Sequence, residues 1–308
     1  MKHRYLPMTE QDQKEMLETI SISSIDELFS DIPEKVRFKG LYNIKEAKSE
    51  SALAKELTAL AAKNADTVNN VSFLGAGVYN HYKPVIVDHV ISRSEFYTAY
   101  TPYQPEISQG ELQAIFEFQT MIAELTGMDL ANSSMYDGGT ALAEAGMLAA
   151  GHTKRKKLLV SGAIHPEYKD VVITYADGQS IEVISVPTKD GVTHIDSLRG
   201  LVDDQTAAVI VQYPNFFGQI EDLKAIGEIV HEQKGLFIVS ANPLALGVLT
   251  PPGKLGADIV AGDAQPFGIA EAFGGPHCGF FAVTTKLMRK VPGRLVGETV
   301  DEQGRRGY

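Results

Sequence analysis

A regular alternation of short apolar runs with helical segments fills the second half of the chain and constrains the fold more than any other feature. The runs are KLLVS, IEVISV, AAVIVQY, LFIVSA, DIVAGD and CGFFAV, and helical patterns begin near residues 165, 195 and 221. Nearly continuous apolar strands separated by helices are typical of a mostly parallel sheet with both faces covered. The sequence therefore predicts an α/β domain with a mostly parallel or mixed sheet between helices.

The first half of the chain predicts helices that lead into this sheet. The longest begins after Ser108, which forms a capping-box pattern with Glu111, and it ends at Gly127, a typical helix stop. A helix rich in small residues follows Gly138-Gly139-Thr140. We expect a helical N-terminal arm over residues 1–65 and one large domain over residues 66–308.

The composition of the 308 residues limits the class of protein and of partner. A hydrophobic content of 44% can bury one large core, and the net charge of −11 disfavours nucleic acid or an anionic membrane as the main partner. The eight histidines lack His-Glu-x-x-His spacing and the single cysteine, Cys278, cannot supply a thiolate cluster, so we expect no metal. The chain shows neither a signal-peptide pattern nor a membrane-spanning apolar run, which predicts a cytoplasmic protein.

Three motifs favour an ordinary structural role. Gly75-Ala76-Gly77 is a weak match to a dinucleotide-binding motif, because the third glycine and a preceding strand are absent. The basic run Lys154–Lys157 fits a solvated turn better than the docking of an acidic partner. Cys278 fits a small buried residue better than a nucleophile, since no base is evident near it in the sequence.

Gly138-Gly139-Thr140 and His165 are candidate ligand-binding residues. Two glycines and a hydroxyl at a helix start present free N–H groups that can hold a phosphate, but a tight turn with Thr140 near the cap explains them comparably well. His165 stands between a predicted strand and a predicted helix, where it can stack on a planar ring or serve as a helix-entry residue. On these residues alone both alternatives stay open.

A polar and aromatic segment over residues 97–108 is the strongest candidate for a binding loop. It contains Tyr97, Tyr100, Thr101, Tyr103, Gln104, Glu106 and Ser108, and two prolines stiffen it. The alternative is an ordinary packed loop in which Ser108 caps the following helix. We favour a recognition role, because a long non-helical loop in a compact domain is often functional.

Three stretches of sequence together resemble the glycine cleavage system P-protein family: SFLGAGVYNHYKP, the run from YTAYTPYQPEISQG through MYDGGTALAEA, and AGDAQPFGIAEAFGGPHCGFF. The resemblance covers essentially the whole chain and is to the N-terminal half of the family's protein, which some bacteria make as a separate subunit. It implies the fold-type I architecture of pyridoxal-phosphate enzymes. It also implies that family members continue past Tyr308 into a smaller C-terminal domain.

The same resemblance implies that this subunit lacks two groups needed to carry the cofactor. In the family's other subunit a lysine precedes a Gly-Gly-Pro turn, and aligning that turn with residues 274–276 places Gln265 at the lysine position, where an amide cannot act as the nucleophile. Ser240 stands where the fold type has an aspartate for the ring nitrogen. A vestigial cradle remains, made of Gly138, Gly139, Thr140 and His165, and pyridoxal phosphate is expected on the partner subunit.

The family's reaction is decarboxylation of glycine, with transfer of the aminomethyl group to the lipoyl arm of the H-protein. The resemblance implies a second P-protein subunit as partner, in a heterotetramer of two copies of each, with the active site at their interface. The residues expected to line that shared pocket are Tyr100, Tyr103, Gln104 and Glu106. Two alternatives stay open: a self-sufficient pyridoxal-phosphate decarboxylase or aminotransferase that uses Lys254 or Lys286, and a purely structural or regulatory partner subunit.

Overall fold

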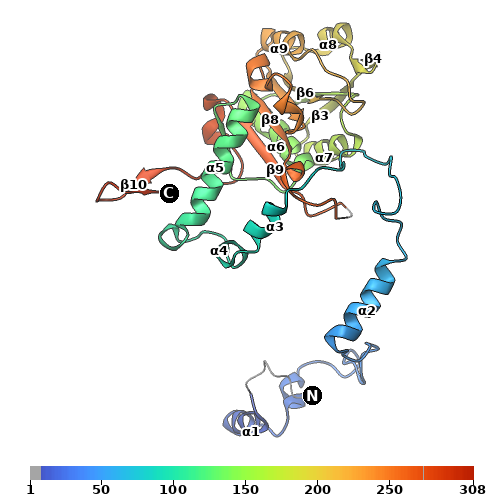
Figure 1. Ribbon diagram of the computed structural model, residues 1–308, viewed down its shortest axis with the longest axis vertical. Helices are drawn as coiled ribbons and strands as arrows, with labels where there is room; N and C mark the ends of the chain where they lie inside the picture. Colours follow the sequence, from blue (N-terminus) through green and yellow to red (C-terminus); the bar gives the residue numbers. More distant parts are fainter. Residues whose placement is uncertain (1–7, 273) are drawn as a thin grey trace. The chain divides into compact units, whose positions relative to one another are not determined.

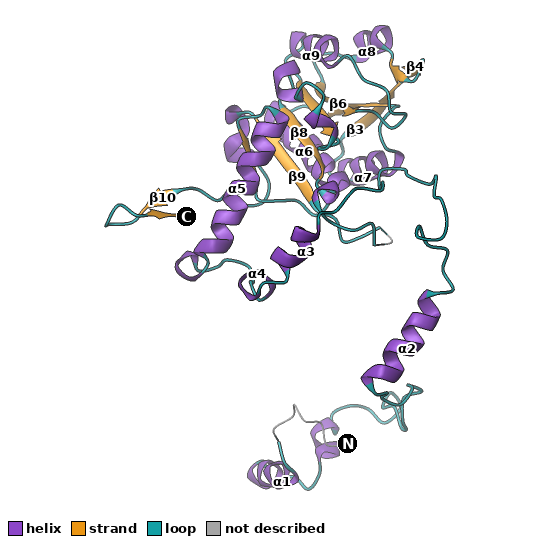
Figure 2. Ribbon diagram, in the orientation of Figure 1, coloured by secondary structure: helices purple, strands orange, loops and turns teal. Residues whose placement is uncertain are grey.

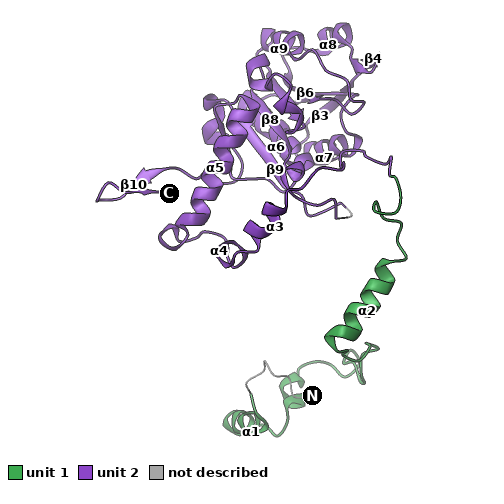
Figure 3. Cartoon of the chain, viewed as in Figure 1, with its two compact units in different colours: residues 1–71 green, residues 72–308 purple. Residues whose placement is uncertain are grey.

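The computed structural model describes residues 8–272 and 274–308, and the chain divides into two compact units, residues 1–71 and 72–308 (Figure 3). In the first unit, helix α1 (Glu10–Thr19) starts with a capping box in which Asp12 N donates to Thr9 Oγ1 at 3.2 Å. A 3-10 turn, η1 (Ile25–Phe29), and helix α2 (Glu50–Ala61) follow, and none of the three elements contains a buried residue. The division into an arm and a large domain with a boundary after residue 65 stays a prediction.

The second unit is built on a seven-stranded sheet with the strand order β1-β9-β8-β7-β6-β2-β3 (Figure 2). Five neighbouring strands, from β8 to β3, are parallel, and β9 pairs antiparallel with both β8 and β1. The sheet is therefore mostly parallel, as predicted. Its strands are β1 (Leu130–Ala131), β2 (Lys157–Ser161), β3 (Glu182–Val186), β6 (Thr206–Tyr213), β7 (Leu236–Ala241), β8 (Ile259–Asp263) and β9 (Gly279–Val283).

Helices cover both faces of this sheet (Figure 1). Helices α6 (Gly138–Thr153) and α7 (Pro166–Asp177) share one apolar cluster with the sheet, and α5 (Gln109–Thr126) and α9 (Leu223–Glu232) share another. Helix α8 (Ile195–Leu201) adds Leu198 to the second cluster. Two minor pairs of strands, β4 (Thr188–Lys189) with β5 (Val192–Thr193) and β10 (Thr299–Val300) with β11 (Arg306–Gly307), and two short helices, α3 (Val85–Ile91) and α4 (Ser94–Tyr97), complete the unit.

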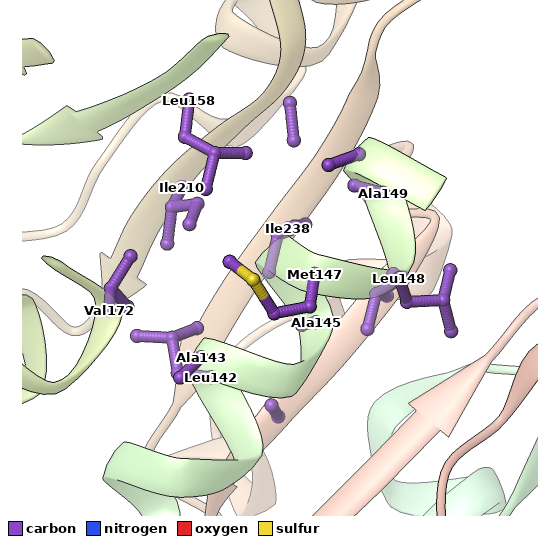
Figure 4. Packing of buried hydrophobic residues seen from close by; sticks show 14 of the residues in the cluster. Leu142, Ala143, Ala145, Met147, Leu148, Ala149, Leu158, Val172, Ile210 and Ile238 are labelled. Carbon is purple, nitrogen blue, oxygen red and sulfur yellow. The ribbon is translucent and has the colours of Figure 1, made fainter. Parts of the chain in front are cut away.

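The core follows from the two-residue periodicity of the strands. In β7, Ile238 faces the α6 side while Phe237 and Val239 face the opposite side, and all three are fully buried. Helix α6 is mostly alanine, glycine and leucine, and its buried residues share one apolar cluster with side chains of β2, β6, β7, β8, β9 and α7, part of which Figure 4 shows. Each large side chain buried in this way stabilises the fold by roughly 1.5–3 kcal/mol.

Helix α5 ends as predicted and begins differently. Gly127 takes the left-handed conformation, with φ of 69°, that lets a helix stop there. Ser108 stands at the N-cap position, but its side chain makes no capping hydrogen bond, so the predicted capping box with Glu111 is wrong. A 3-10 turn, η2 (Pro105–Ile107), runs straight into the helix, and Gln109 Nε2 donates to the Pro105 carbonyl at 2.9 Å.

Candidate functional site

The candidate site lies where the parallel strands end, at the carboxyl edge of the sheet. In open α/β sheets this edge is where ligands bind. His165 follows β2, Ser240 lies near the end of β7, and Gln265 follows β8. A hydrogen bond of 2.8 Å from His165 N to Gln212 Oε1 joins the ends of β2 and β6. The fold thus brings to one edge of the sheet residues that lie up to 100 positions apart in the sequence.

Carboxylates of the chain itself accept hydrogen bonds at the N-terminus of α6. Asp137 is the N-cap residue, and its Oδ1 accepts from Thr140 N at 2.7 Å and from Thr140 Oγ1 at 2.9 Å. Asp263 Oδ2, from the end of β8, accepts from Gly138 N at 3.1 Å. These are the donors and the positive helix end that would otherwise attract a phosphate.

Tyr168 fills the space between this helix end and His165. A Cβ atom on Gly138 would lie 2.6 Å from Tyr168 Oη, and one on Gly139 would lie 3.3 Å from Tyr168 Cδ1. The Tyr168 ring stacks on the His165 ring with 4.8 Å between centroids. Burial, together with the nearby carboxylates of Asp263 and Asp137, raises the pKa of Tyr168, so its phenol stays protonated. The two glycines are needed because the tyrosine ring packs directly on them.

His165 is only 7% exposed, and both of its ring nitrogens are hydrogen-bonded. As the N-cap of α7 it accepts from Glu167 N at Nδ1, 3.2 Å away. Nε2 therefore carries the proton and donates to the Ala76 carbonyl at 2.6 Å, which assigns a neutral ring. His165 stands at the helix entry, and its stacking partner is Tyr168 of the same chain.

Gln265 is 2% exposed and starts a 3-10 turn, η5 (Gln265–Phe267), after β8. Its Nε2 donates to the Ile269 carbonyl at 2.6 Å, and its backbone N donates to Asp263 Oδ1 at 2.8 Å. Ser240 is 3% exposed in β7 and pairs in register with Gln212 and Ala261 of the flanking strands. The Gln265 side chain holds a turn, and the Ser240 side chain is a neutral hydroxyl buried in a central strand.

Asp263 is the centre of this site, and the sequence reasoning missed it. Besides Gly138 N and Gln265 N, it accepts from His277 Nδ1 at 2.9 Å. The only sequence signal was a lone aspartate at the end of an otherwise apolar strand. Asp137, Tyr168 and His277 were missed as well, because nothing in their local sequence marks them.

The two lysines considered as cofactor-binding residues lie at the opposite edge of the sheet. Lys254 is in the turn η4 (Pro252–Leu255) before β8 begins, and Lys286 is in η6 (Thr285–Lys290) after β9 ends. Because β9 runs antiparallel to β8, both positions are at the amino end of β8. A strand of five residues spans roughly 15 Å, so neither lysine reaches the residues around Asp263.

The segment over residues 97–108 lines two hollows of the second unit. The first, of about 790 Å³, is lined by residues that include Tyr100, Thr101, Ser133 and Ser134. The second, of about 840 Å³, includes Tyr100, Tyr103 and Gln104. Tyr100 is 80% and Tyr103 72% exposed, and the Arg294 guanidinium lies 5.5 Å from the Tyr103 ring centroid. Glu106 is exposed and is not among the residues that line either hollow.

The basic run Lys154–Lys157 is not a simple solvated turn, so that prediction is wrong in part. Arg155 Nη1 donates to the carbonyls of Thr206 at 2.8 Å and Gln233 at 2.7 Å. Lys157 Nζ donates to the Leu201 carbonyl at 2.8 Å and pairs with Asp203 at 2.6 Å. Arg155 therefore links the start of β6 to the end of α9, and Lys157 links β2 to the end of α8.

Three smaller observations complete the site. Burial raises the pKa of the partly buried Cys278 thiol, with Asp263 as the second cause, which argues against a thiolate nucleophile. Across residues 8–272 and 274–308, no group of three or more His, Cys, Asp and Glu side chains is arranged to hold a metal ion. Among those same residues, no helix is both long and apolar enough to cross a membrane.

The sheet order, the covering helices and the site at the carboxyl edge define the fold of the fold-type I pyridoxal-phosphate enzymes. The sphingosine-1-phosphate lyase of Burkholderia pseudomallei shares this fold, with a TM-score of 0.62 over 84% of this chain and 64% of that chain, at 15% identity. The family model of the glycine cleavage system P-protein matches residues 3–308. The chain belongs to this family and is an enzyme subunit of that system.

Two similar proteins agree with this assignment. A probable glycine dehydrogenase (decarboxylating) subunit 1 from Lysinibacillus sphaericus is 84% identical over 308 residues, which are 100% of this chain and 69% of the relative. The crystal structure of a glycine decarboxylase (P-protein) of the glycine cleavage system, in inhibitor-bound form, superposes with a TM-score of 0.90 at 46% identity. The superposed region covers 99% of this chain and 68% of the glycine decarboxylase chain.

Proposed function

We propose that this chain is the subunit of the P-protein that does not carry the cofactor. With its partner subunit it decarboxylates glycine in the cytoplasm and transfers the aminomethyl group to the lipoyl arm of the H-protein. Pyridoxal phosphate, held by the partner, supplies the electron sink for this reaction. The similarity to a protein described as subunit 1 supports a partnership with a second subunit. We propose that the two assemble as a heterotetramer of two copies of each.

The observation that carries the proposal is that the cradle at the carboxyl edge does not fit pyridoxal phosphate. A phosphate at the start of α6 would have to displace Asp137 and Asp263 from the backbone donors and would meet their like charge. A ring beside His165 would have to displace Tyr168. Gln265 and Ser240 offer neither a nucleophilic amine nor a carboxylate for the ring nitrogen. This chain therefore needs a partner that holds the cofactor.

The contribution of this chain to the reaction is proposed to come from the loop Tyr100–Ser108. Its aromatic and amide side chains are exposed and line hollows, which supports a pocket that a second subunit completes. In this proposal Tyr100, Tyr103 and Gln104 bind and orient a small substrate there and exclude water from it. Glu106 is retained as an orienting carboxylate, which must turn toward the pocket on assembly.

One experiment tests the division of labour between the subunits. The chain alone, incubated with pyridoxal phosphate, should show no protein-bound visible absorption, and borohydride reduction should attach cofactor to no lysine. The chain mixed with its partner should support glycine decarboxylation that neither subunit performs alone. Stoichiometric labelling of Lys254 or Lys286 would instead establish the self-sufficient enzyme and refute the proposal.

A further inference from the structure

The turn Gly75–Gly77 has a backbone conformation that requires its two glycines. The φ angles of Gly75, Ala76 and Gly77 are +53°, +55° and +99°, three successive residues in the left-handed region. A Cβ on Gly75 would lie 2.8 Å from Tyr79 Cε1, and one on Gly77 would lie 2.8 Å from both Cδ2 and Nε2 of His165. Alanine rarely adopts such a φ, so surrounding contacts must hold Ala76 there.

His165 provides that contact. Its Nε2 donates to the Ala76 carbonyl at 2.6 Å, and Gly77 packs directly against the same edge of the ring. The ring itself is held rigidly by the N-terminus of α7 and by stacking on Tyr168. The side chain expected to stack on a cofactor thus holds the turn Gly75–Gly77.

A second contact joins the same segment to the position predicted for the lysine. Gly268 ends the η5 turn with φ of +150°, and a Cβ there would lie 3.2 Å from Val87 Cγ1 in helix α3. Gln265 closes this turn through its bond to the Ile269 carbonyl. Helix α3 therefore rests on the turn that Gln265 maintains.

We infer that His165 of the cradle and the neighbouring turn Gln265–Gly268 are two anchor points that hold residues 72–98 in place. Between these anchors and Tyr100 the segment has no buried residue of its own in α3 or α4, and Tyr82, Val85 and Tyr97 are exposed. A segment with so few buried contacts opens locally unless it is fixed elsewhere. The anchors hold the chain that leads into the loop Tyr100–Ser108, so His165 is a positioning residue.

Amide hydrogen exchange of the assembled complex tests the anchoring directly. Gly77→Ala places a Cβ against His165 and should speed exchange over residues 72–98 by about tenfold or more. Gly218→Ala is the matched control, because Gly218 has a φ of +78° but nothing within 4 Å of the added Cβ. It introduces backbone strain without touching the segment, and exchange over 72–98 should not change.

His165→Asn gives a second variant that does not depend on glycine. Its side-chain oxygen can still accept from Glu167 N at the start of α7, but it has no donor that reaches Ala76. It should also speed exchange over residues 72–98, while exchange in α7 stays close to that of the parent. Unchanged exchange of the segment in both His165→Asn and Gly77→Ala overturns the anchoring inference.

The effect on activity rests on the proposed function and is read separately. In the complex, both variants should lower the rate of glycine decarboxylation about tenfold or more while the absorption spectrum of the partner's cofactor stays unchanged. Faster exchange combined with full activity would support the anchor and contradict the shared pocket. Slower turnover with parental exchange would contradict the anchor and leave the shared pocket intact.

Discussion

The cradle at the carboxyl edge of the sheet and the loop Tyr100–Ser108 are opposites in how their polar groups are used. His165 in the cradle and Gln265 beside it are buried, and each is hydrogen-bonded to the chain's own backbone. In the loop, Tyr100 and Tyr103 are mostly exposed. A polar group already bonded within its own chain gives up that bond when it binds a ligand, whereas an exposed group exchanges only water. The comparison therefore favours the loop over the cradle as the part of this chain that contributes to the proposed reaction.

The largest effect is expected from the loop. Tyr103→Phe and Gln104→Ala should lower glycine decarboxylation by the complex, because each removes a hydrogen-bonding group from the proposed shared pocket. Loss of one well-placed bond to a reacting group costs about 2–4 kcal/mol, or roughly thirty- to a thousandfold in rate. Steady-state rates at saturating subunit, with the partner's cofactor spectrum recorded in parallel, measure this effect.

Gln113→Ala in α5 is the control for Gln104→Ala, since Gln113 bonds to Glu117 and lines neither hollow. Glu106→Gln tests whether that carboxylate enters the pocket on assembly. A parental rate in this variant would show that Glu106 is not part of the shared pocket. If excess subunit restores the parental rate to every loop variant, the loop is an interface and the chain is a scaffold.

The cradle should respond in stability. Gly138→Ala places a Cβ 2.6 Å from Tyr168 Oη and 3.0 Å from Asp263 N, and we expect a loss of about 1–3 kcal/mol in the free energy of unfolding. Gly139→Ala, with 3.3 Å to its nearest atom, should cost less. Gly151→Ala near the other end of α6 meets nothing within 4 Å and should be neutral or stabilising. Urea unfolding of the three variants measures the order.

The outcome for Gly138→Ala also bears on the comparison of the two regions. A variant that loses activity while keeping parental stability and parental binding to the partner would mean that the start of α6 holds a ligand. The cradle would then be a working site, and its contrast with the loop would disappear.

A smaller, pH-dependent effect should arise at the amino edge of the sheet, away from both regions. The hydrogen bond to Asp258 is the main cause that raises the pKa of His231, with 2.8 Å between His231 Nε2 and Asp258 Oδ2. A raised pKa in the folded state stabilises the chain below the unfolded value of about 6.5, and this contribution is lost as the pH rises through the folded pKa.

We expect this contribution to stay below about 1 kcal/mol, since the His231 side chain is 43% exposed and screened by solvent. Unfolding curves at a series of pH values should show the decline in the parent and a shallower one in His231→Gln. If the parent and His231→Gln show the same pH dependence of stability, His231 is not the source of the decline.

The last prediction is a null result: Gln265→Lys should not enable the chain to bind pyridoxal phosphate. A lysine there would face a site in which carboxylates and Tyr168 hold the positions of the phosphate and the ring, and Ser240 cannot pair the ring nitrogen. Titration of the isolated variant with pyridoxal phosphate should yield no protein-bound visible band. A stoichiometric band would show that the cradle needs only its lysine and would refute the account of why the two regions differ.

Local sequence predicts six of the seven strands of the sheet and misses the two-residue strand β1. The six apolar runs became strands and Gly127 ended α5, because strand periodicity and a left-handed helix stop depend on neighbouring residues alone. The family motifs also identify the correct family. Local pattern was less reliable at Ser108. The turn Pro105–Ile107 runs directly into α5, and the Ser108 side chain does not make the predicted capping hydrogen bond.

Contacts between distant parts of the chain distinguish the alternative interpretations of the cradle residues. Gly138-Gly139-Thr140 reads equally well as a phosphate site or a tight turn, and the difference depends on Asp263, 125 positions away, and on Tyr168. His165 reads as a stacking or a helix-entry residue, and the turn at Ala76, 89 positions away, shows what its second nitrogen binds. The local sequence around Gly138 or His165 is the same whether its hydrogen-bonding groups are free or already bonded. The partners, Asp263 and Ala76, come from distant parts of the chain and reach these groups only in the folded structure.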